Sequence, residues 1–416
     1  MGKYVIKGGN KIDGKIKIES AKNSVLPLLA GSILTSEKVV IKDCPKIKDV
    51  LSMIKILNSI GVKSEFSGGD LTVDASGICG YTLPAPLTGE LRSSVFMLGA
   101  LISRTKKAVI SYPGGCDIGL RPIDIHIKGL RRLGVTITET GGELICTSGN
   151  IYGREVYLDF PSVGATENLM LGSVFCKGET VIKNAAKEPE IIDLMNFLNS
   201  MGAEIYGGGT TTILVRGVSR LHGTVYKPMP DRIEAGTFLV AAAITGGEIE
   251  ISNVKVENIS SLIHKLCDNT CKITTNNDII HLKSSGVRKA FDIETNPYPG
   301  FPTDLQAQMT TLATVSEGTS VITENIFEMR FKFARELIKM GADIKFFGNT
   351  AVVKGVKKLH GAQVKAEDLR GGASLVLAGL CAEGKTIVSD IGHVERGYLS
   401  FDKKLSSLGV DIKKKN

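Results

Sequence analysis

The stretch MIKILNSIGVKSEFSGGDLTVDA, residues 53–75, decides the fold because it contains one complete copy of a repeated structural pattern. Apolar residues recur at helical spacing up to Gly61, and glycine readily adopts the left-handed conformation that ends a helix. The alternating residues that follow predict a strand, a turn at Gly68 and Gly69, and a second strand. We therefore expect an amphipathic helix followed by a pair of strands.

The same pattern of a helix and two strands recurs along the chain. Further copies end their helices at Gly134, Gly202, Gly341 and Gly409, the last copy being cut short. The gap between Gly202 and Gly341 is about twice as long as the others, so we expect one diverged copy within it, at residues 262–284. Six copies at intervals of about 70 residues indicate an internally repeated fold.

A second pattern alternates with the first and consists of an apolar helix rich in small residues, a turn and a strand. Its copies begin at residues 20, 91, 164, 232, 302 and 369. These helices are apolar on nearly every side, which is typical of helices buried in a core. Three units wrapped around their own helices, made twice, predict two similar globular α/β domains with a cleft between them.

One position at the start of these apolar helices is often polar. Counted back from the following strand, this position holds Asn23, Arg92, Gly164, Ile233, Asp304 and Arg370. Helix starts carry unpaired N–H groups and a positive dipole end, so they favour anions. Capping alone can explain Asn23 or Asp304, but arginine is a poor N-cap and has the wrong charge for this end. Arg92 and Arg370 therefore indicate an anionic partner.

The composition is that of a soluble globular protein. Of 416 residues, 43% are apolar and 23% are charged, with a net charge of +8. Lys and Arg are spread along the chain, whereas nucleic-acid binders usually concentrate them. There is no signal-peptide pattern, the longest apolar stretches reach about half of the roughly 20 residues of a membrane span, and the cysteines show no pairing pattern. We expect a cytoplasmic protein with no membrane span and no nucleic-acid partner.

The stretch YPGGCDIGLRP, residues 112–122, places Cys116 on a glycine-rich loop near Arg121. A single cytosolic cysteine is usually unreactive. This chain, however, also offers Asp304 behind two X-Pro bonds that stiffen its approach, together with several cations. Such a set supplies a proton donor, a proton acceptor and clamps for phosphate or carboxylate groups.

Other functional signatures are missing or weak. The sequence lacks the GxxxxGK[ST], GxGxxG and GxSxG motifs. His264, Cys267, Cys271 and His281 are zinc-ligand residue types within the diverged copy, but we favour ordinary structural cysteines there.

With these motifs in view, the chain resembles the UDP-N-acetylglucosamine 1-carboxyvinyltransferases, a family of enolpyruvyl transferases. The resemblance extends over essentially the full length and is carried by SAKNS, PGGCDIGLRPIDIHIKG, PSVGATEN, PDRIEAGTFLVAAA, GFPTDLQAQ and DLRGGASLVLAG. It implies a two-domain inverse α/β barrel, the enolpyruvyl transferase fold, with three repeats in each domain and the active site in the interdomain cleft. Domain one would span residues 22–229, and domain two residues 1–21 and 230–416.

The resemblance implies a reaction as well as a fold. The enolpyruvyl group of phosphoenolpyruvate would move to the 3-hydroxyl of UDP-N-acetylglucosamine by addition and elimination, with release of phosphate. No metal and no organic cofactor is implied. We expect a monomer, with other states left open.

The resemblance also implies residue roles. Cys116 resembles the proton donor, and Asp304 resembles the base that faces the sugar hydroxyl. The phosphoenolpyruvate clamp would consist of Lys22, Arg121 and Arg396, with Arg92 beside it, while Asn23 steadies the sugar. Further implied contacts are Arg121, Pro122, Ile123, Asp124 and Ile125 for uridine, Ser162, Val163 and Gly164 for the diphosphate, Ile326 for the acetamido sugar, and Arg330, Asp368 and Arg370 along the cleft.

Two departures from the family pattern stand out. Phe160 stands where some members carry a lysine, so that cation comes from elsewhere or is absent. In the diverged repeat, residues 269–272 read NTCK where the sister copies read IGV, LGV or MGA, a change that concerns packing more than chemistry.

Three alternatives remain to be weighed. The sibling 5-enolpyruvylshikimate-3-phosphate synthase shares the fold and the donor but does not use a PGGC loop. An RNA 3′-phosphate cyclase would need a histidine motif that this chain lacks. A non-catalytic paralogue that binds the sugar nucleotide should have lost Cys116, Asp304 or Lys22, and all three are present; whether the chain is a main or an auxiliary copy stays open.

Overall fold

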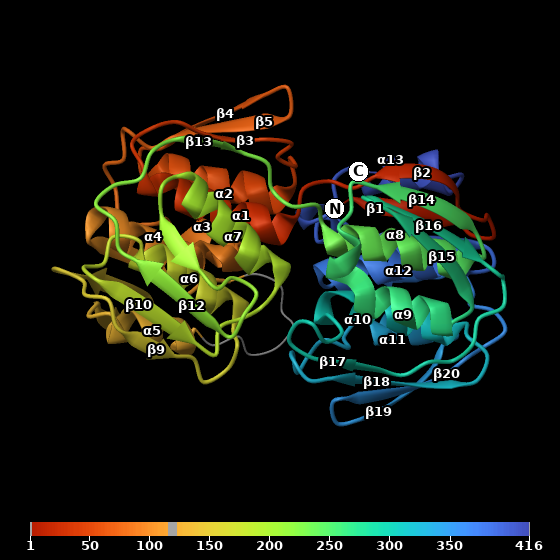
Figure 1. Cartoon of the computed structure of the whole chain (residues 1–416). Coiled ribbons are helices and arrows are strands. Elements are labelled where there is room, and N and C mark those ends of the chain that lie inside the picture. The colour runs from red at the N-terminus through yellow and green to blue at the C-terminus, as the bar shows by residue number, and fades with distance from the viewer. Residues whose placement is uncertain (1, 115–122, 416) are drawn as a thin grey trace. The chain divides into compact units, whose positions relative to one another are not determined.

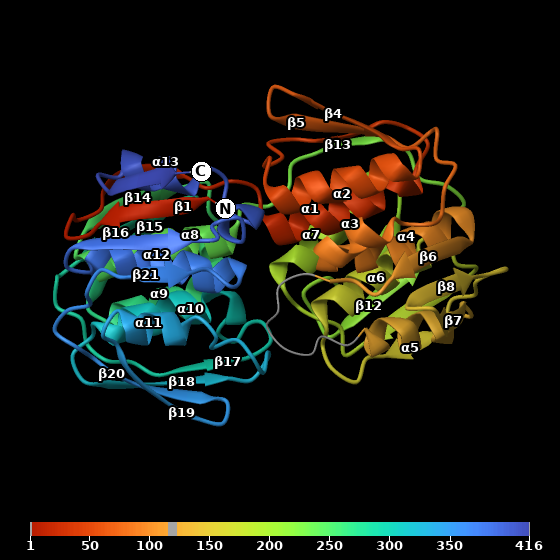
Figure 2. The same cartoon turned by 180° about the vertical axis from the view of Figure 1, so that it is seen from behind.

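The computed structural model describes residues 2–114 and 123–415. These residues divide into two compact units. The first unit comprises residues 20–114 and 123–229, and the second comprises residues 2–19 and 230–415. Within each unit, three small sheets surround a set of central helices (Figures 1 and 2).

The first unit contains three repeats. The first repeat consists of α1 (Lys22–Gly31), η1 (Ser32–Leu34), β3 (Val39–Ile41), α2 (Lys48–Ser59), β4 (Lys63–Ser67) and β5 (Asp70–Asp74). The second consists of α3 (Ala85–Glu90), η2 (Arg92–Val95), α4 (Phe96–Thr105), β6 (Lys107–Ser111), α5 (Asp124–Arg132), β7 (Thr136–Thr140) and β8 (Glu143–Thr147). The third consists of β9 (Glu155–Tyr157), α6 (Val163–Ser173), β10 (Glu179–Lys183), α7 (Pro189–Ser200), β11 (Glu204–Tyr206) and β12 (Thr212–Arg216), after which β13 (Thr224–Tyr226) returns to the first sheet.

The second unit follows the same plan. Its first repeat consists of α8 (Arg232–Thr245), β14 (Glu248–Ser252), η3 (Val256–Ile259), α9 (Ser260–Asp268), β15 (Cys271–Asn276) and β16 (Ile279–Ser284). The next consists of β17 (Ile293–Thr295), η4 (Thr303–Leu305), α10 (Gln306–Thr314), β18 (Thr319–Glu324), α11 (Ala334–Lys339), β19 (Asp343–Phe347) and β20 (Thr350–Lys354). The last consists of β21 (Gln363–Lys365), α12 (Leu369–Cys381), β22 (Lys385–Ser389), η5 (Val394–Arg396), α13 (Phe401–Ser407) and β23 (Asp411–Lys415).

Two strands near the N-terminus complete sheets of the second unit. In a typical sheet, such as β17-β18-β20-β19, a parallel strand flanks the strand that follows the buried helix, and a hairpin pairs on its other side. The last repeat has only one hairpin strand, and β1 (Lys3–Lys7) fills the missing place between β22 and β23. Similarly, β2 (Asp13–Lys17) supplies the parallel strand beside β14. The truncated final repeat is therefore completed by residues from the start of the chain.

The apolar helices form the core, as the sequence predicts. In α8, all residues from Arg232 to Ile244 are buried, and in α12 the same holds from Leu369 to Leu380. In Figure 1, α8, α10 and α12 lie between the sheets of the second unit. In the first unit, α4 and α6 approach so closely that a Cβ at Gly99 would lie 2.2 Å from the Asn168 carbonyl oxygen. The small residues of these helices thus permit close packing.

The helix-ending glycines have the left-handed conformation that the sequence predicts. Gly61, Gly134 and Gly202 have φ of +92°, +96° and +98°, respectively. The diverged repeat is confirmed as α9 followed by the β15–β16 hairpin, and Thr270 occupies the equivalent position with φ of +75°. The Thr270 hydroxyl lies 2.8 Å from that of Ser285 and also donates to the Val287 carbonyl. These contacts hold a β-branched residue in a conformation that it rarely adopts.

Candidate functional site

The six residues counted back from the strands all stand at helix starts, which confirms the prediction. Asn23, Gly164, Ile233 and Arg370 are second residues of α1, α6, α8 and α12. Arg92 opens η2, which leads into α4, and Asp304 lies in η4, which leads into α10. The repeats therefore present one equivalent position six times, and its chemistry differs from copy to copy.

In the second unit, Asp304 and Arg370 from this position lie together, and Arg330, from the segment between β18 and α11, joins them. Arg330 Nη2 lies 2.7 Å from Asp304 Oδ1, and Arg370 Nη2 lies 2.9 Å from Asp304 Oδ2. The arginine side chains are 4% and 3% exposed, whereas that of Asp304 is 26% exposed. Two buried cations therefore hold the Asp304 carboxylate in place, while part of this side chain remains exposed to solvent. The anionic partner expected for Arg370 is, within the protein, Asp304.

A buried polar network supports Arg370. Its Nη1 donates to the Tyr398 hydroxyl at 3.1 Å, and that hydroxyl lies 2.8 Å from the Thr237 hydroxyl. Burial acts to lower the pKa of Arg370, but the attraction of Asp304, Tyr398 and Asp231, together with the hydrogen bond to Asp304, outweighs it and holds the pKa above its usual value. Asp368, 3% exposed, accepts hydrogen bonds from the N–H groups of Arg370 and Gly371 and so caps α12.

Two more predicted residues belong to this unit. The Ile326 N–H donates to Glu324 Oε1 at 2.9 Å, and the Thr303 hydroxyl donates to the other oxygen of Glu324. Glu324 thus ties the segment after β18 to the residue that precedes Asp304. Arg396 is half-buried at the end of η5, two residues before Tyr398.

The first unit presents cations at its helix starts. Lys22 opens α1, and its Nζ lies 3.4 Å from Asp49 Oδ2 on α2, with both side chains largely buried. Asn23 follows it and is half-buried. Arg92 Nη1 donates to the Pro113 carbonyl at 3.2 Å. The Arg92 guanidinium group therefore contacts the backbone at Pro113, close to the end of the described range 2–114.

The starts of α5 and α6 pack on each other in the same unit. A Cβ at Gly164 would lie 3.1 Å from Cε1 of His126, so the glycine allows the first turn of α6 to lie against this ring. Asn168 Nδ2 donates to His126 Nδ1 at 3.0 Å. Burial, and next the charge of Arg92, lowers the pKa of His126 to about 3, so the ring is neutral.

The predicted nucleotide residues stand around this packed pair of helices. Ile123 is buried and precedes α5, which begins with Asp124 and Ile125. Ser162 caps α6, since its hydroxyl accepts a hydrogen bond from the N–H of Ala165 at 3.3 Å, and Val163 is the first residue of that helix. The two segments that the resemblance gives to the nucleotide thus meet at adjacent helix starts.

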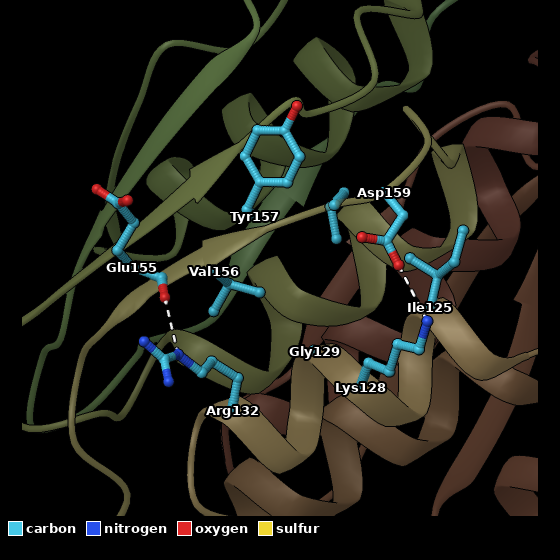
Figure 3. Close-up of a pocket in the computed structure, with 9 residues that line it drawn as sticks. Ile125, Lys128, Gly129, Arg132, Glu155, Val156, Tyr157 and Asp159 are labelled. Atoms are coloured by element: carbon cyan, nitrogen blue, oxygen red, sulfur yellow. Dashed lines mark hydrogen bonds and ion pairs between the residues drawn. The ribbon is translucent and has the colours of Figure 1, made fainter.

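A pocket of about 340 Å³ lies beside these helix starts. Its lining residues come from α5 and from the strand β9 with the two residues after it: Ile125, Lys128, Gly129, Arg132, Glu155, Val156, Tyr157, Leu158 and Asp159. Figure 3 shows Lys128 and Asp159 converging near Ile125, whereas Arg132 points to the backbone of Glu155. The end near Ile125, where Lys128 pairs with Asp159 and Asp124, therefore includes the last residue of the predicted uridine segment.

Some predicted residues lie outside the described part of the chain. These are Cys116, Arg121 and Pro122. The four zinc-ligand residue types do not form a metal site in the described chain: His281 Nε2 lies 2.9 Å from Glu248 Oε1, and no group of three or more His, Cys, Asp or Glu side chains within residues 2–114 and 123–415 is placed to hold a metal. In the same ranges, no helix combines the length and apolar character that a bilayer crossing requires.

Sequence reasoning missed three groups near these residues. Asp49 pairs with Lys22, Tyr398 supports Arg370, and Lys128 lies in the pocket. Tyr398 could have been noticed, since it follows Arg396 closely in the stretch HVERGY. Lys128 could have been noticed as well, since it lies four residues after Asp124 in the same motif, whereas Asp49 carries no such signal because its partner Lys22 lies 27 residues away in the sequence.

Comparison with known proteins gives the family. The family model described as EPSP synthase (3-phosphoshikimate 1-carboxyvinyltransferase) matches residues 6–405. A UDP-N-acetylglucosamine 1-carboxyvinyltransferase 2 from Caldanaerobacter subterraneus subsp. tengcongensis is 53% identical over 99% of both chains. The chain belongs to the UDP-N-acetylglucosamine 1-carboxyvinyltransferase family. A relative named UDP-N-acetylglucosamine 1-carboxyvinyltransferase 1, from Clostridium acetobutylicum, is 49% identical over the full length of both chains.

Solved structures agree with the family at the level of the fold. The enolpyruvyl transferase NikO from Streptomyces tendae has a TM-score of 0.89 at 25% identity, covering 99% of this chain and 98% of that one. An EPSP synthase from Acinetobacter baumannii has a TM-score of 0.75 at 20% identity over the full length of both chains. The enolpyruvyl transferase fold expected from the sequence is therefore confirmed.

Proposed function

We propose that the protein is an enzyme that transfers the enolpyruvyl group of phosphoenolpyruvate to the 3-hydroxyl of UDP-N-acetylglucosamine, the first committed step of peptidoglycan synthesis. The observation that carries this proposal is the identity of 53% over 99% of the chain to a relative named for this activity. The outward-facing Asp304, held at 2.7 and 2.9 Å by Arg330 and Arg370, supports it because the reaction needs a fixed proton acceptor.

The proposed chemistry has two balanced steps. In the addition, Asp304 takes the proton of the sugar 3-hydroxyl, the oxygen bonds to C2 of phosphoenolpyruvate, and Cys116 delivers a proton to C3, which becomes a methyl group. In the elimination, C3 loses a proton to the Cys116 thiolate, the C2–O bond to phosphate breaks, the double bond forms again, and the departing phosphate takes the proton held by Asp304. Neither step uses a metal or an organic cofactor.

Cations of both units serve the charged donor in this proposal. Lys22, Arg121 and Arg396 clamp its phosphate and carboxylate, and Arg92 lies beside them. Two anionic groups on one small molecule need several cations, and guanidinium groups bind them through paired hydrogen bonds. The ion pair of Lys22 with Asp49 supports its role, because a separation of 3.4 Å is long for such a contact and the ammonium group can turn to a stronger anion.

The remaining residues bind the acceptor in this proposal. Asn23 and the carbonyl of Ile326 hold the sugar, since the Ile326 N–H already donates to Glu324. Residues 121–125 bind uridine, and residues 162–164 bind the diphosphate at the start of α6, where the helix dipole favours anions. Arg330, Asp368 and Arg370 position Asp304 and α12 rather than touch the reacting atoms.

The proposal has consequences for organisation. We take residues 22–229 as domain one and residues 1–21 with 230–416 as domain two, with groups from both serving one reaction in a cleft. A single copy of the chain supplies all the groups named, so a monomer suffices. A cytoplasmic location agrees with the seven described cysteines, which are all free thiols.

The deciding experiment measures phosphate release from phosphoenolpyruvate by the purified chain. Release should require UDP-N-acetylglucosamine and should not occur with shikimate-3-phosphate. Release with shikimate-3-phosphate instead would make the protein a synthase of the sibling kind, and release with neither would refute the transferase proposal.

The same assay tests Cys116. The variant Cys116→Ser should lose most of the phosphate release because serine is a far weaker acid than cysteine. Fosfomycin, an epoxide analogue of phosphoenolpyruvate, should add its mass to the wild-type chain and not to this variant, as read by intact-protein mass spectrometry. Full rate in the serine variant would show that Cys116 is not the proton donor.

A further inference from the structure

The last residue of β18 carries a buried carboxylate that joins two separate segments of the second unit. This residue, Glu324, is 3% exposed. Its Oε1 accepts hydrogen bonds from the N–H groups of Ile326 and Phe327 at 2.9 and 3.0 Å. Its Oε2 accepts a hydrogen bond from the hydroxyl of Thr303, 21 residues earlier in the chain, at 2.9 Å. Each oxygen of the carboxylate therefore serves a different segment.

The formation of a turn explains only one of these two oxygens. A side chain that accepts hydrogen bonds from backbone N–H groups two and three residues further on stabilises a turn locally, and Oε1 of Glu324 does this. Oε2 has no such local role, because Thr303 belongs to a different element, η4. Thr303 directly precedes Asp304, so this second hydrogen bond leads to the proposed proton acceptor.

A further set of contacts links the same two segments. Arg330 Nη2 donates to the Thr303 carbonyl at 3.3 Å as well as to Asp304 Oδ1 at 2.7 Å. The Arg330 guanidinium group also lies 5.6 Å from the centre of the Phe327 ring, within the range of a cation–π contact. The residue whose N–H group is bound by Glu324 thus packs against a cation that fixes Asp304. Contacts therefore lead from Glu324 to Asp304 by two routes, one through each oxygen.

The backbone of Glu324 is itself held in place. Its N–H group donates to the Asn349 carbonyl at 2.9 Å, and Asn349 Nδ2 donates to the Glu324 carbonyl at 3.2 Å. On the other side, Glu324 pairs with Thr295 of β17. A side chain on a sheet strand with both of its oxygens bound has little freedom to move, which is what the accurate placement of a reacting group requires.

We propose that Glu324 is a positioning residue that holds the Asp304 carboxylate and the Ile326 carbonyl at one fixed separation. The inference rests on the proposed function, in which the sugar is held at Ile326 while Asp304 accepts the proton of its 3-hydroxyl. One acceptor molecule must meet both groups at once. A change of about 1 Å in their separation would therefore move the hydroxyl away from its base, and a displacement of this size can lower a rate by about 100-fold.

Two substitutions of Glu324 separate the reach of the side chain from its charge. Glu324→Asp keeps the charge but is shorter by one carbon–carbon bond, about 1.5 Å, so its oxygens should no longer reach both segments. Glu324→Gln keeps the length, since its amide oxygen can accept the two N–H groups and its amide nitrogen can donate to the Thr303 hydroxyl.

The measurement is phosphate release at varied UDP-N-acetylglucosamine. Its kcat/KM should fall by about 100-fold in Glu324→Asp and by less than about tenfold in Glu324→Gln, which keeps the contacts as weaker, uncharged hydrogen bonds. Equal losses, or a greater loss in Glu324→Gln, would show that the reach of this side chain does not set the rate and would overturn the proposal.

Variants of Thr303 test the link to Asp304 alone, and they decide the question if Glu324→Asp does not fold. Thr303→Val keeps the shape but lacks the hydroxyl, so kcat should fall by about tenfold, the equivalent of one hydrogen bond. The KM for UDP-N-acetylglucosamine should stay within about twofold, because the contacts at Ile326 remain. Thr303→Ser keeps the hydroxyl and should retain kcat to within about threefold. Equal kcat in these two variants, each shown to be folded by circular dichroism, would refute the link.

Glu317 provides the matched control. It is exposed and lies just before the start of β18, at the opposite end of the strand from Glu324. Glu317→Asp and Glu317→Gln should both keep the wild-type kcat/KM. Failure of the proposed function has a different signature: wild type that releases no phosphate with UDP-N-acetylglucosamine refutes the transferase, whereas active wild type with equally active Glu324 variants refutes only the positioning role.

Discussion

The two units use the same three-repeat scaffold, but the polar residues at their equivalent helix starts have opposite arrangements. In the second unit, one carboxylate is central: Asp304 is held by the buried cations Arg330 and Arg370. In the first unit, cations are central: Lys22 and Arg92 point to Asp49 and to a backbone carbonyl. In the proposed function, the helix starts of the second unit would thus supply a fixed proton acceptor, and those of the first unit would supply anion-binding groups. The scaffold supplies the place, and the residue at each place supplies the chemistry.

Removing the central carboxylate should break this contrast most strongly. Asp304→Asn keeps the size of the side chain but cannot accept the proton of the sugar hydroxyl, so kcat should fall by about 1,000-fold, within the usual range for a lost general base. The measurement is phosphate release with both substrates saturating. Asp343→Asn, an exposed aspartate on β19 of the same unit, serves as the control and should keep the wild-type rate.

Folding of the Asp304→Asn variant needs its own measurement. Arg370 is 2% exposed and would lose its anionic partner, which destabilises a buried cation. Circular dichroism and a thermal melt therefore accompany the rate measurement. A folded variant that retains more than about a tenth of the wild-type rate would be inconsistent with a general base, since such groups contribute at least about 100-fold.

A change of pH should distinguish the two units through a smaller effect, this time on stability. The interior of the first unit contains His126, whose pKa is lowered to about 3, whereas the buried network of the second unit uses Tyr398, whose pKa burial raises above its usual value. Unfolding lets His126 bind a proton near its ordinary pKa of about 6.5. The unfolded state therefore binds more protons between about pH 6.5 and 3, and stability is lost as the pH falls through that window, by about 1.4 kcal/mol at pH 5.5.

The measurement is the free energy of unfolding from urea denaturation at pH 7.5 and pH 5.5. In His126→Gln, the loss between the two pH values should shrink by the amount that the histidine contributes. His222→Gln changes an exposed histidine of the same unit and should leave the wild-type loss intact. The same loss in all three proteins would show that His126 is not the residue that titrates.

Much of this architecture could be predicted from local patterns. Apolar spacing and the helix-ending glycines predict the six repeats, and counting back from the strands predicts the six helix starts, because both depend on residues close in the sequence. The filling of the last sheet by β1 has no local signal, since Lys3–Lys7 pairs with strands at the other end of the chain. The partners of the predicted site residues, such as Asp49 and Tyr398, were missed for the same reason. The place of a residue within its repeat follows from nearby sequence, whereas its contacts in space do not.

The smallest effect concerns the glycine that ends each amphipathic helix, a place where the units differ in backbone conformation rather than in charge. All three such residues are glycine in the first unit, but Thr270 takes one of the places in the second. Gly134 has φ of +96°, and a Cβ added there would meet open space, so Gly134→Thr should cost about 1–2 kcal/mol from backbone strain alone. Thr270→Gly relieves similar strain but loses the hydroxyl contacts with Ser285 and Val287, so it should change stability by less than about 1 kcal/mol.

Urea denaturation of the two variants and wild type checks this pair. A third protein, Gly134→Ala, separates strain from branching: it should be destabilised less than Gly134→Thr because a single methyl group tolerates the left-handed region better than a β-branched side chain. If Thr270→Gly lost as much stability as Gly134→Thr, the threonine hydroxyl would be the dominant clamp in the diverged repeat. If it gained more than about 1 kcal/mol, the hydroxyl contacts would contribute nothing, and the strain at Thr270 would stand uncompensated.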